Sequence, residues 1–155
     1  MEINLFFLGF LIAAAMVSGG YFTQQGMAWY HTSLVLPSFT PPDWVFGPVW
    51  TVIYALTFVC MYRVWNYFPH DRYTTATMIL FVINMVLNAA WSYLFFTRHL
   101  IGWSLLDAIA LVATVIGMMV CIAQHSKVTA LLLLPYAVWG AFASYLTYTI
   151  WVLNR

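Results

Sequence analysis

Charged side chains are scarce in this chain of 155 residues, which holds five lysine and arginine residues and four aspartate and glutamate residues. A soluble domain of this length cannot cover its surface with so few charges, so that class is excluded. The basic residues are scattered around the expected loops, and this distribution provides no patch for nucleic acid. We therefore expect a protein whose solvent is mostly lipid.

Motifs for metals, redox chemistry and common enzymes are also missing. Cys60 and Cys121 have no CxxC spacing, so neither a disulfide framework nor a metal site is expected. No phosphate-binding glycine loop, nucleophile elbow or HExxH motif occurs. The spans lack histidines that could hold a haem by axial ligation. All four histidines lie in or beside expected loops: His31, His70, His99 and His125. This pattern favours a binding protein over an enzyme.

Long apolar runs are what the chain does contain, and 65% of its residues are apolar. Five runs are long enough to cross a hydrocarbon layer of about 30 Å as helices, which takes about 20 residues. The alternation expected of a β-barrel strand is absent, for example, from Leu105–Cys121. We predict an all-α membrane protein, a single domain of five transmembrane helices over residues 1–155. The predicted spans are Ile3–Thr23, Trp44–Tyr67, Thr74–Thr97, Ile101–Ala123 and Val128–Leu153.

The connections set the expected topology. Met1 and Glu2 provide no positive region of a signal peptide, so the first helix is expected to be retained. The first connection, Gln24–Asp43, is long, contains three prolines, and suggests an ordered lid. The later connections are short and make successive helices antiparallel neighbours. Basic residues slightly favour the N-terminal side as cytoplasmic, at Arg63, Arg72 and Lys127 against Arg98 and Arg155.

Eight tryptophans divide into two groups by their position in the apolar runs. Five lie near the ends of the runs, where amphipathic indoles suit the membrane–water interface. This group consists of Trp29, Trp44, Trp65, Trp103 and Trp151. The others, Trp50, Trp91 and Trp139, lie well inside, where an indole N–H needs a partner in the protein or a ligand.

Depth and helical spacing bring the unusual residues of the spans together. Trp50 and Trp91 each lie about six residues from the side of the long connection, a depth of roughly 10 Å. Tyr54, Asn88 and then Asn84 follow toward the midplane. Residues such as Asn84, Asn88 and Trp91 fall on one helical face. An aromatic pocket with few polar groups is one interpretation. The alternative to a pocket is that the asparagines hold the helices together and that Pro135 produces a packing kink.

Asp107 is the one acidic residue well inside a predicted span, at about the same depth as Trp50. An intramembrane carboxylate can relay protons or bind a cation. The chain offers no second intramembrane carboxylate for a relay, and Arg98 precedes Asp107 on the same side. A structural hydrogen bond or ion pair is therefore favoured for Asp107 over a functional role.

The motif P-S-F-T-P-P-D-W-V-F-G-P-V-W at residues 37–50 closely resembles the signature of the translocator protein family, also called tryptophan-rich sensory proteins. Trp29-Tyr30, Asn84, Asn88, Trp91 and Trp139 match further positions, and the resemblance covers nearly the whole chain. It implies a five-helix bundle, often dimeric, with a pocket under the first loop. Pairs of small residues such as Gly9/Ala13 provide possible dimer contacts.

The resemblance also implies the ligands: tetrapyrroles such as protoporphyrin IX or haem, and synthetic benzodiazepine-site ligands. No obligatory cofactor is implied. It suggests a bacterial cell-membrane protein with a sensory, transport or porphyrin-homeostasis role. The implied ligand-contact residues, together with Tyr54 and Asn88 from the spacing, are Tyr30, Trp50, Tyr54, Asn84, Asn88, Trp91, Trp139, Phe142 and Ala143.

Two other functions stay open at this point. Some bacterial members are reported to promote light-dependent porphyrin breakdown, and Trp50 and Trp139 match the tryptophans involved. A structural or accessory membrane subunit, with its indoles serving as packing, is the third possibility. Sterol binding is not expected, because Val152 stands where animal members have the arginine of a weak sterol motif. Leu36 and Phe39 also depart from the family motif.

Overall fold

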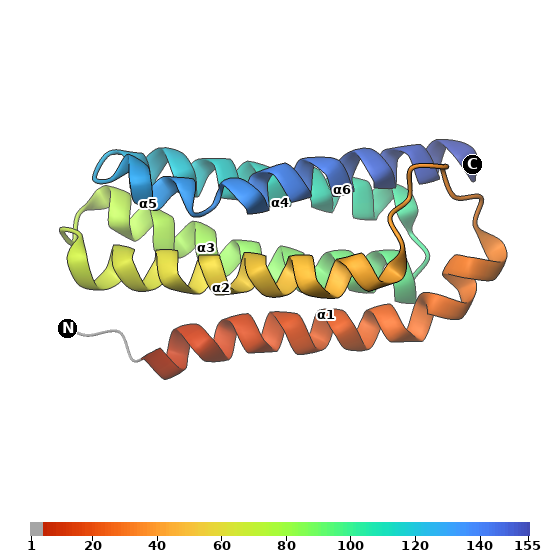
Figure 1. Ribbon diagram of the computed structural model, residues 1–155, viewed down its shortest axis with the longest axis horizontal. Coiled ribbons are helices and arrows are strands. Elements are labelled where there is room, and N and C mark those ends of the chain that lie inside the picture. The colour runs from red at the N-terminus through yellow and green to blue at the C-terminus, as the bar shows by residue number, and fades with distance from the viewer. Residues whose placement is uncertain (1–4) are drawn as a thin grey trace.

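The computed structural model describes residues 5–155, and these form a bundle of helices with no strand among them (Figure 1). Five helical stretches are long and apolar enough to span a membrane. The prediction of an all-α membrane bundle is confirmed; the predicted start at Ile3 lies outside the described residues. The elements are α1 (Leu5–Ser33), α2 (Asp43–Tyr67), α3 (Arg72–Ser92), η1 (Tyr93–Thr97), α4 (Ile101–Ala123), α5 (Lys127–Leu131) and α6 (Leu134–Leu153).

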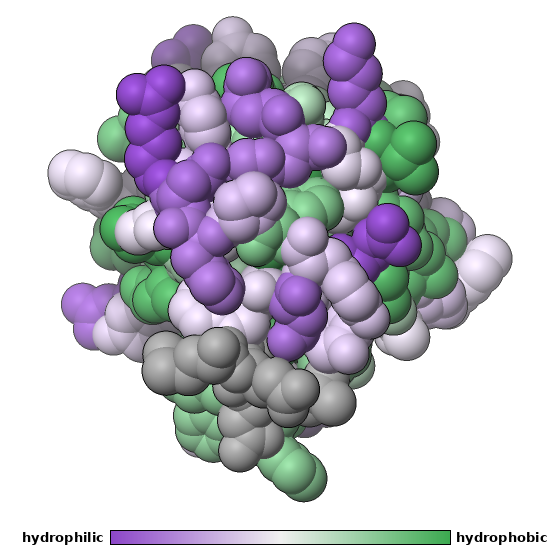
Figure 2. All heavy atoms as spheres, turned by 90° about the vertical axis from the view of Figure 1, so that its left-hand side faces the viewer, coloured by the Kyte–Doolittle hydropathy of each residue, from purple (hydrophilic) through white to green (hydrophobic). Residues whose placement is uncertain are grey.

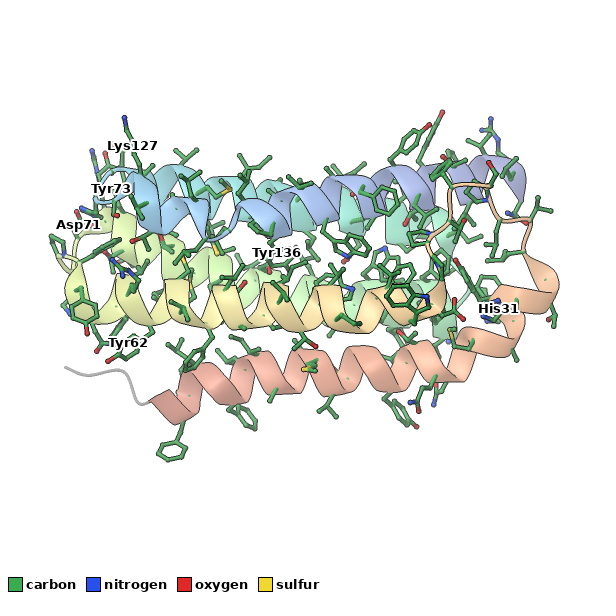
Figure 3. The ribbon with its side chains drawn as sticks, in the orientation of Figure 1. His31, Tyr62, Asp71, Tyr73, Lys127 and Tyr136 are labelled. Carbon is green, nitrogen blue, oxygen red and sulfur yellow. The ribbon has the colours of Figure 1, made fainter. Side chains whose placement is uncertain are left out.

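The polar residues collect at the ends of the bundle. Figure 2 looks onto the left-hand end of Figure 1, where hydrophilic residues cover the end and apolar residues surround its sides. Asp71, Tyr73 and Lys127 lie at this end, and His31 lies at the other (Figure 3). This arrangement suits a protein whose ends face water and whose sides face lipid, as a multi-pass integral membrane protein requires.

Helix α1 is longer than predicted, and the first loop is correspondingly shorter. The predicted loop began at Gln24, whereas α1 continues to Ser33 and leaves only residues 34–42 between α1 and α2. No proline interrupts the chain before Pro37, and Pro37 disfavours helical backbone at the residue before it. The end of α1 passes beyond the start of α2 and bends toward the end of α6 (Figure 1).

Gly26 lets this extension of α1 pack closely against η1. A Cβ atom at Gly26 would lie 2.3 Å from the carbonyl oxygen of Phe96, which is far inside van der Waals contact. The extension is held further by Trp29, whose ring stacks on His99 with centroids 3.8 Å apart. His99 itself has a φ of 55°, the left-handed conformation that turns the chain from η1 into α4.

The third and fifth predicted spans contain irregularities, and the sequence indicated only a kink at Pro135 in the fifth. The third ends in the π-helical turn η1, in which the Arg98 N–H bonds to the carbonyl of Tyr93 at 3.0 Å. The fifth is two helices. The N–H groups of Leu132 and Leu133 bond to carbonyls three residues back, at 3.2 and 3.1 Å, before α6 begins with Pro135 in its first turn. Proline is well tolerated there, since the first N–H groups of a helix lack helical partners anyway.

Candidate ligand pocket

A cavity of about 410 Å³ lies between α1, α2, α3, η1, α4 and α6. Its size falls within the range of small-molecule sites, which is roughly 300–1,000 Å³. Most of its walls are apolar or aromatic. The lining residues are Met16, Gly19, Gly20, Thr23, Gln24, Met27, Tyr30, Asp43, Phe46, Gly47, Trp50, Tyr54, Asn88, Trp91, Ser92, Phe95, Phe96, Ala108, Leu111, Trp139, Gly140, Ala143, Leu146, Thr147 and Ile150.

The three interior indoles all line this cavity, each from a different helix. Trp50 lies on α2, 5.5 Å between ring centroids from Tyr54. Trp91 on α3 stacks on Phe95 at 5.2 Å and an interplanar angle of 15°. Trp139 on α6 meets the edge of Phe46 at 5.6 Å. Each ring is held by an aromatic neighbour, so the walls of the cavity are shaped before any ligand arrives.

Two of these indoles carry unused hydrogen-bond donors. Among the described residues, Nε1 of Trp91 and Nε1 of Trp139 are buried and have no hydrogen-bond partner. Leaving a buried donor unpaired costs about 1–3 kcal/mol. Both tryptophans lie in the cavity wall. A ligand that presents acceptor atoms to these two N–H groups would remove this cost.

A hydrogen-bonded network forms the base of the cavity and joins α2, α3 and α6. The Tyr54 hydroxyl donates to Oδ1 of Asn88 at 2.6 Å, and Nδ2 of Asn88 donates to the Tyr136 hydroxyl at 3.1 Å. The Tyr136 hydroxyl in turn donates to Oδ1 of Asn84 at 2.7 Å. Figure 3 places Tyr136 within the middle of the bundle.

Asn84 extends this network to α4. Its Nδ2 donates to Thr114 Oγ1 at 2.8 Å and to the carbonyl of Leu111 at 3.2 Å. Both its oxygen and its nitrogen are therefore used within the protein. Asn84 is fully buried and does not line the cavity. In this structure it holds helices together, which is the alternative that the sequence left open.

The remaining predicted site residues divide between the wall and the layer behind it. Phe142 does not line the cavity but packs against Trp139 with centroids 5.4 Å apart. The predicted residues that do line it are Tyr30, Trp50, Tyr54, Asn88, Trp91, Trp139 and Ala143. Whether these residues bind a ligand stays a prediction.

Asp107 lies outside the cavity wall, although the next residue, Ala108, is part of it. Its Oδ2 atom is buried without a hydrogen-bond partner. The ion pair considered with Arg98 does not form among the described residues, where the ion pairs are His31–Asp43 and His125–Asp71. Arg98 is exposed to solvent instead.

Much of the cavity wall comes from α1, and the sequence did not predict this contribution beyond Tyr30. Met16, Gly20, Thr23, Met27 and Tyr30 recur at steps of four and three residues, the spacing of one helical face. Because residues from Gln24 onward were predicted to form a loop, no helical face was expected there. Continuing the helical spacing of the first span to Tyr30 would have revealed it.

The actual loop, residues 34–42, does not line the cavity. It is tied to the end of α6, where Asn154 Oδ1 accepts from the Val35 N–H at 2.8 Å and Nδ2 donates to the Val35 carbonyl at 3.0 Å. Phe39 stacks on Tyr145 at 5.4 Å. The predicted lid is therefore a short strap fastened to α6, and the helical end of α1 lines the cavity in its place.

The described part of the chain contains no group of three or more histidine, cysteine, aspartate or glutamate side chains that could hold a metal ion. Cys60 and Cys121 are free thiols. The cavity therefore offers rings, a few hydroxyl and amide groups, and one carboxylate, Asp43, at its edge.

Comparison with known proteins gives consistent matches over nearly the whole chain. The sequence model of the TspO/MBR family matches residues 7–152. The chain is 37% identical to the tryptophan-rich protein TspO of Chlorobaculum tepidum, over 93% of this chain and 91% of that protein. It is 41% identical to the protein of the same name from Archaeoglobus fulgidus, over 92% of each chain. It is 32% identical to the human translocator protein, over 93% of this chain and 87% of that one.

Proposed function

The chain belongs to the TspO/MBR family, and on that premise we propose that its cavity binds tetrapyrroles such as protoporphyrin IX or haem. The protein would act as a membrane receptor or carrier in sensing, transport or porphyrin homeostasis. A flat apolar ligand suits a cavity walled by three indoles from three helices.

The observation that carries this proposal is the pair of unpartnered N–H groups on Trp91 and Trp139. The protein uses the other polar groups at the base of the cavity, on Tyr54 and Asn88, in its own network. The two indoles are therefore ready to donate to a ligand. A tetrapyrrole offers broad apolar faces to the rings, and its carboxylates provide acceptor atoms.

A fluorescence titration tests the proposal. Adding protoporphyrin IX to the detergent-solubilised protein is expected to quench tryptophan emission saturably. The double variant Trp50→Ala/Trp139→Ala removes two indole rings from the cavity wall and is expected to lose most of its affinity for protoporphyrin IX. The matched control is Trp44→Ala/Trp103→Ala, because both side chains are exposed, at 74% and 64%. Unchanged affinity in the first double variant would reject this site.

Light-dependent porphyrin breakdown is a second candidate function, favoured by the arrangement of rings around Trp50. Its ring lies 5.5 Å from that of Tyr54 and 5.8 Å from that of Tyr136. Close oxidisable rings could donate an electron to a photoexcited porphyrin, with dioxygen as the final oxidant. The complex is illuminated in air and scanned for a new absorbing product. Equal product yield from Trp50→Phe/Trp139→Phe would exclude catalysis by these indoles.

An accessory structural subunit is the remaining alternative. It predicts no saturable binding of protoporphyrin IX, together with co-purification of a partner protein. The same titration therefore separates this role from the receptor and from the photochemical enzyme.

A further inference from the structure

Several cavity-lining residues are also exposed on the outside of the bundle. On α1 these are Met16, Gly20 and Gln24, and on α2 Asp43 and Gly47. Among the cavity-lining residues, none on α3, η1, α4 or α6 is exposed. The exposed lining residues thus mark a slit between α1 and α2.

The glycines show why the slit stays open. A Cβ atom built on Gly20 or on Gly47 would meet nothing within 4 Å. On the neighbouring face of α1 the situation is reversed. A Cβ atom on Gly19 would lie 3.4 Å from Ser92 Oγ, and one on Gly26 would collide with the backbone of Phe96. Helix α1 is therefore packed against α3 at Gly19 and against η1 at Gly26, while the space at Gly20 is unfilled.

Specific contacts hold the elements at the two ends of the cavity. The network of Tyr54, Asn88 and Tyr136 lies at the base. The strap 34–42 is fastened to α6 through Val35 and Asn154. His31 and Asp43, 2.9 Å apart, join the ends of α1 and α2 beside the strap.

The slit runs from the polar edge of the membrane into its hydrocarbon. Along α2 the lining residues extend from Asp43 to Tyr54, about 16 Å at the rise of an α-helix. The polar end carries Asp43 and Gln24, and the deep part carries Met16 and Gly20. A ligand with a polar edge and an apolar body would therefore meet matching surroundings on its way in.

We propose that the slit between α1 and α2 is a lateral portal through which an amphipathic, membrane-dissolved ligand passes between the lipid leaflet and the cavity. The inference rests on the proposed binding function and adds the source of the ligand, which is the bilayer. Gly20 and Gly47 are the residues that keep the portal open.

The variant Gly20→Phe places a ring in the slit, and Gly9→Phe is its matched control. Gly9 lies on the same helix, also has open space at its Cβ position, and does not line the cavity. Binding and release of protoporphyrin IX are followed by tryptophan quenching in phosphatidylcholine vesicles. Gly20→Phe is expected to slow both association and release by about tenfold relative to Gly9→Phe, because its ring obstructs the path. Gly47→Phe obstructs the slit from α2 and serves as the second variant.

Releasing the strap tests the competing route. Asn154→Ala removes both bonds to Val35 and lies outside the cavity wall, so entry through the slit leaves its rates unchanged. Faster exchange in Asn154→Ala would overturn the portal in favour of entry under the strap. Rates of Gly20→Phe and Gly47→Phe equal to those of Gly9→Phe would also overturn it, as would weaker affinity without slower association. Absence of saturable binding in the unaltered protein overturns the binding function as well, which separates the two failures.

Discussion

The hydroxyl of Tyr136 donates a 2.7 Å hydrogen bond to Oδ1 of Asn84 and accepts a 3.1 Å bond from Nδ2 of Asn88. One phenol on α6 thereby orients two amides on α3. The amide groups cannot flip without losing partners, because Nδ2 of Asn84 donates to Thr114 and Oδ1 of Asn88 accepts from Tyr54.

Removing the hydroxyl in Tyr136→Phe is expected to destabilise the protein by about 1–3 kcal/mol, because two buried amide groups lose their partner. Thermal unfolding in detergent measures the effect. Tyr145→Phe is the control, since the Tyr145 side chain is 59% exposed. Equal melting temperatures for the two variants would show that the network contributes nothing to stability.

Gly26 and Gly20 form a matched pair on α1. Gly26→Ala is expected to lower stability by about 1–3 kcal/mol, because the added methyl group would overlap the backbone of Phe96. Gly20→Ala is expected to be neutral or stabilising by up to about 1 kcal/mol, since alanine favours helix and its Cβ atom meets open space. Comparing the two unfolding temperatures checks the packing of α1 on η1. The opposite order would contradict it.

Trp139→Phe keeps an aromatic ring in the cavity but removes the unpartnered N–H group. We expect its affinity for protoporphyrin IX to fall by about three- to tenfold, corresponding to the loss of one hydrogen bond of ordinary strength. Trp103→Phe, at an exposed position, is the control in the same fluorescence titration. An unchanged Kd would mean that the ligand does not accept from this indole.

Asn154→Ala is expected to release the strap from α6. Amide hydrogen exchange of residues 34–42 should become faster, while exchange in α3 and α4 should stay unchanged. Asn66→Ala is a suitable control because Nδ2 of Asn66 donates to the carbonyl of Tyr62, a contact within its own helix. Unaltered exchange in the strap would mean that other contacts suffice to hold it.

Asp71 provides an acid-sensitive contact at the opposite end of the bundle. Hydrogen bonds from the backbone N–H of Thr74, from His125 and from the N–H of Tyr73 hold the pKa of its carboxyl below the usual 3.8. A lowered folded-state pKa stabilises the fold fully above the unfolded pKa, near pH 4, and this stabilisation is lost as pH falls through the folded pKa.

The corresponding experiment compares unfolding of the wild-type protein and Asp71→Asn from neutral pH to about pH 2. Asparagine also caps helix N-termini, so the two proteins should be similarly stable at neutral pH. The wild type is expected to lose more stability in acid, because only its cap can be protonated. Parallel curves would exclude Asp71 as a source of acid sensitivity.

The sequence predicted the spans well because membrane insertion needs only length and apolar composition, which are local properties. It also predicted that Trp50, Trp91 and Trp139 would face one region, since depth and helical spacing follow from position in the chain. Three properties stay predictions: homodimerisation, the identity of the membrane, and the cytoplasmic placement of the end that carries Arg63, Arg72 and Lys127.

The errors arose where tertiary contacts decide the local structure. The predicted first span ended with its apolar run at Thr23, whereas contacts such as the close approach of Gly26 to Phe96 accompany a helix that continues to Ser33. Asn84 and Asn88 look alike in sequence. The rotation of α3 and the position of Tyr136 decide that Asn88 lines the cavity while Asn84 lies behind it.

The turn η1 requires a fixed number of residues in the segment that connects α3 to α4. A π-helical turn closes its hydrogen bonds over five residues instead of four, so Tyr93–Thr97 holds one residue more than α-helix geometry requires. Deleting a single residue here would restore a regular helix and rotate the following chain by about 100°. Phe95 and Phe96, both buried, could not then keep their neighbours, and His99 would leave Trp29. This segment should therefore tolerate substitutions far better than insertions or deletions.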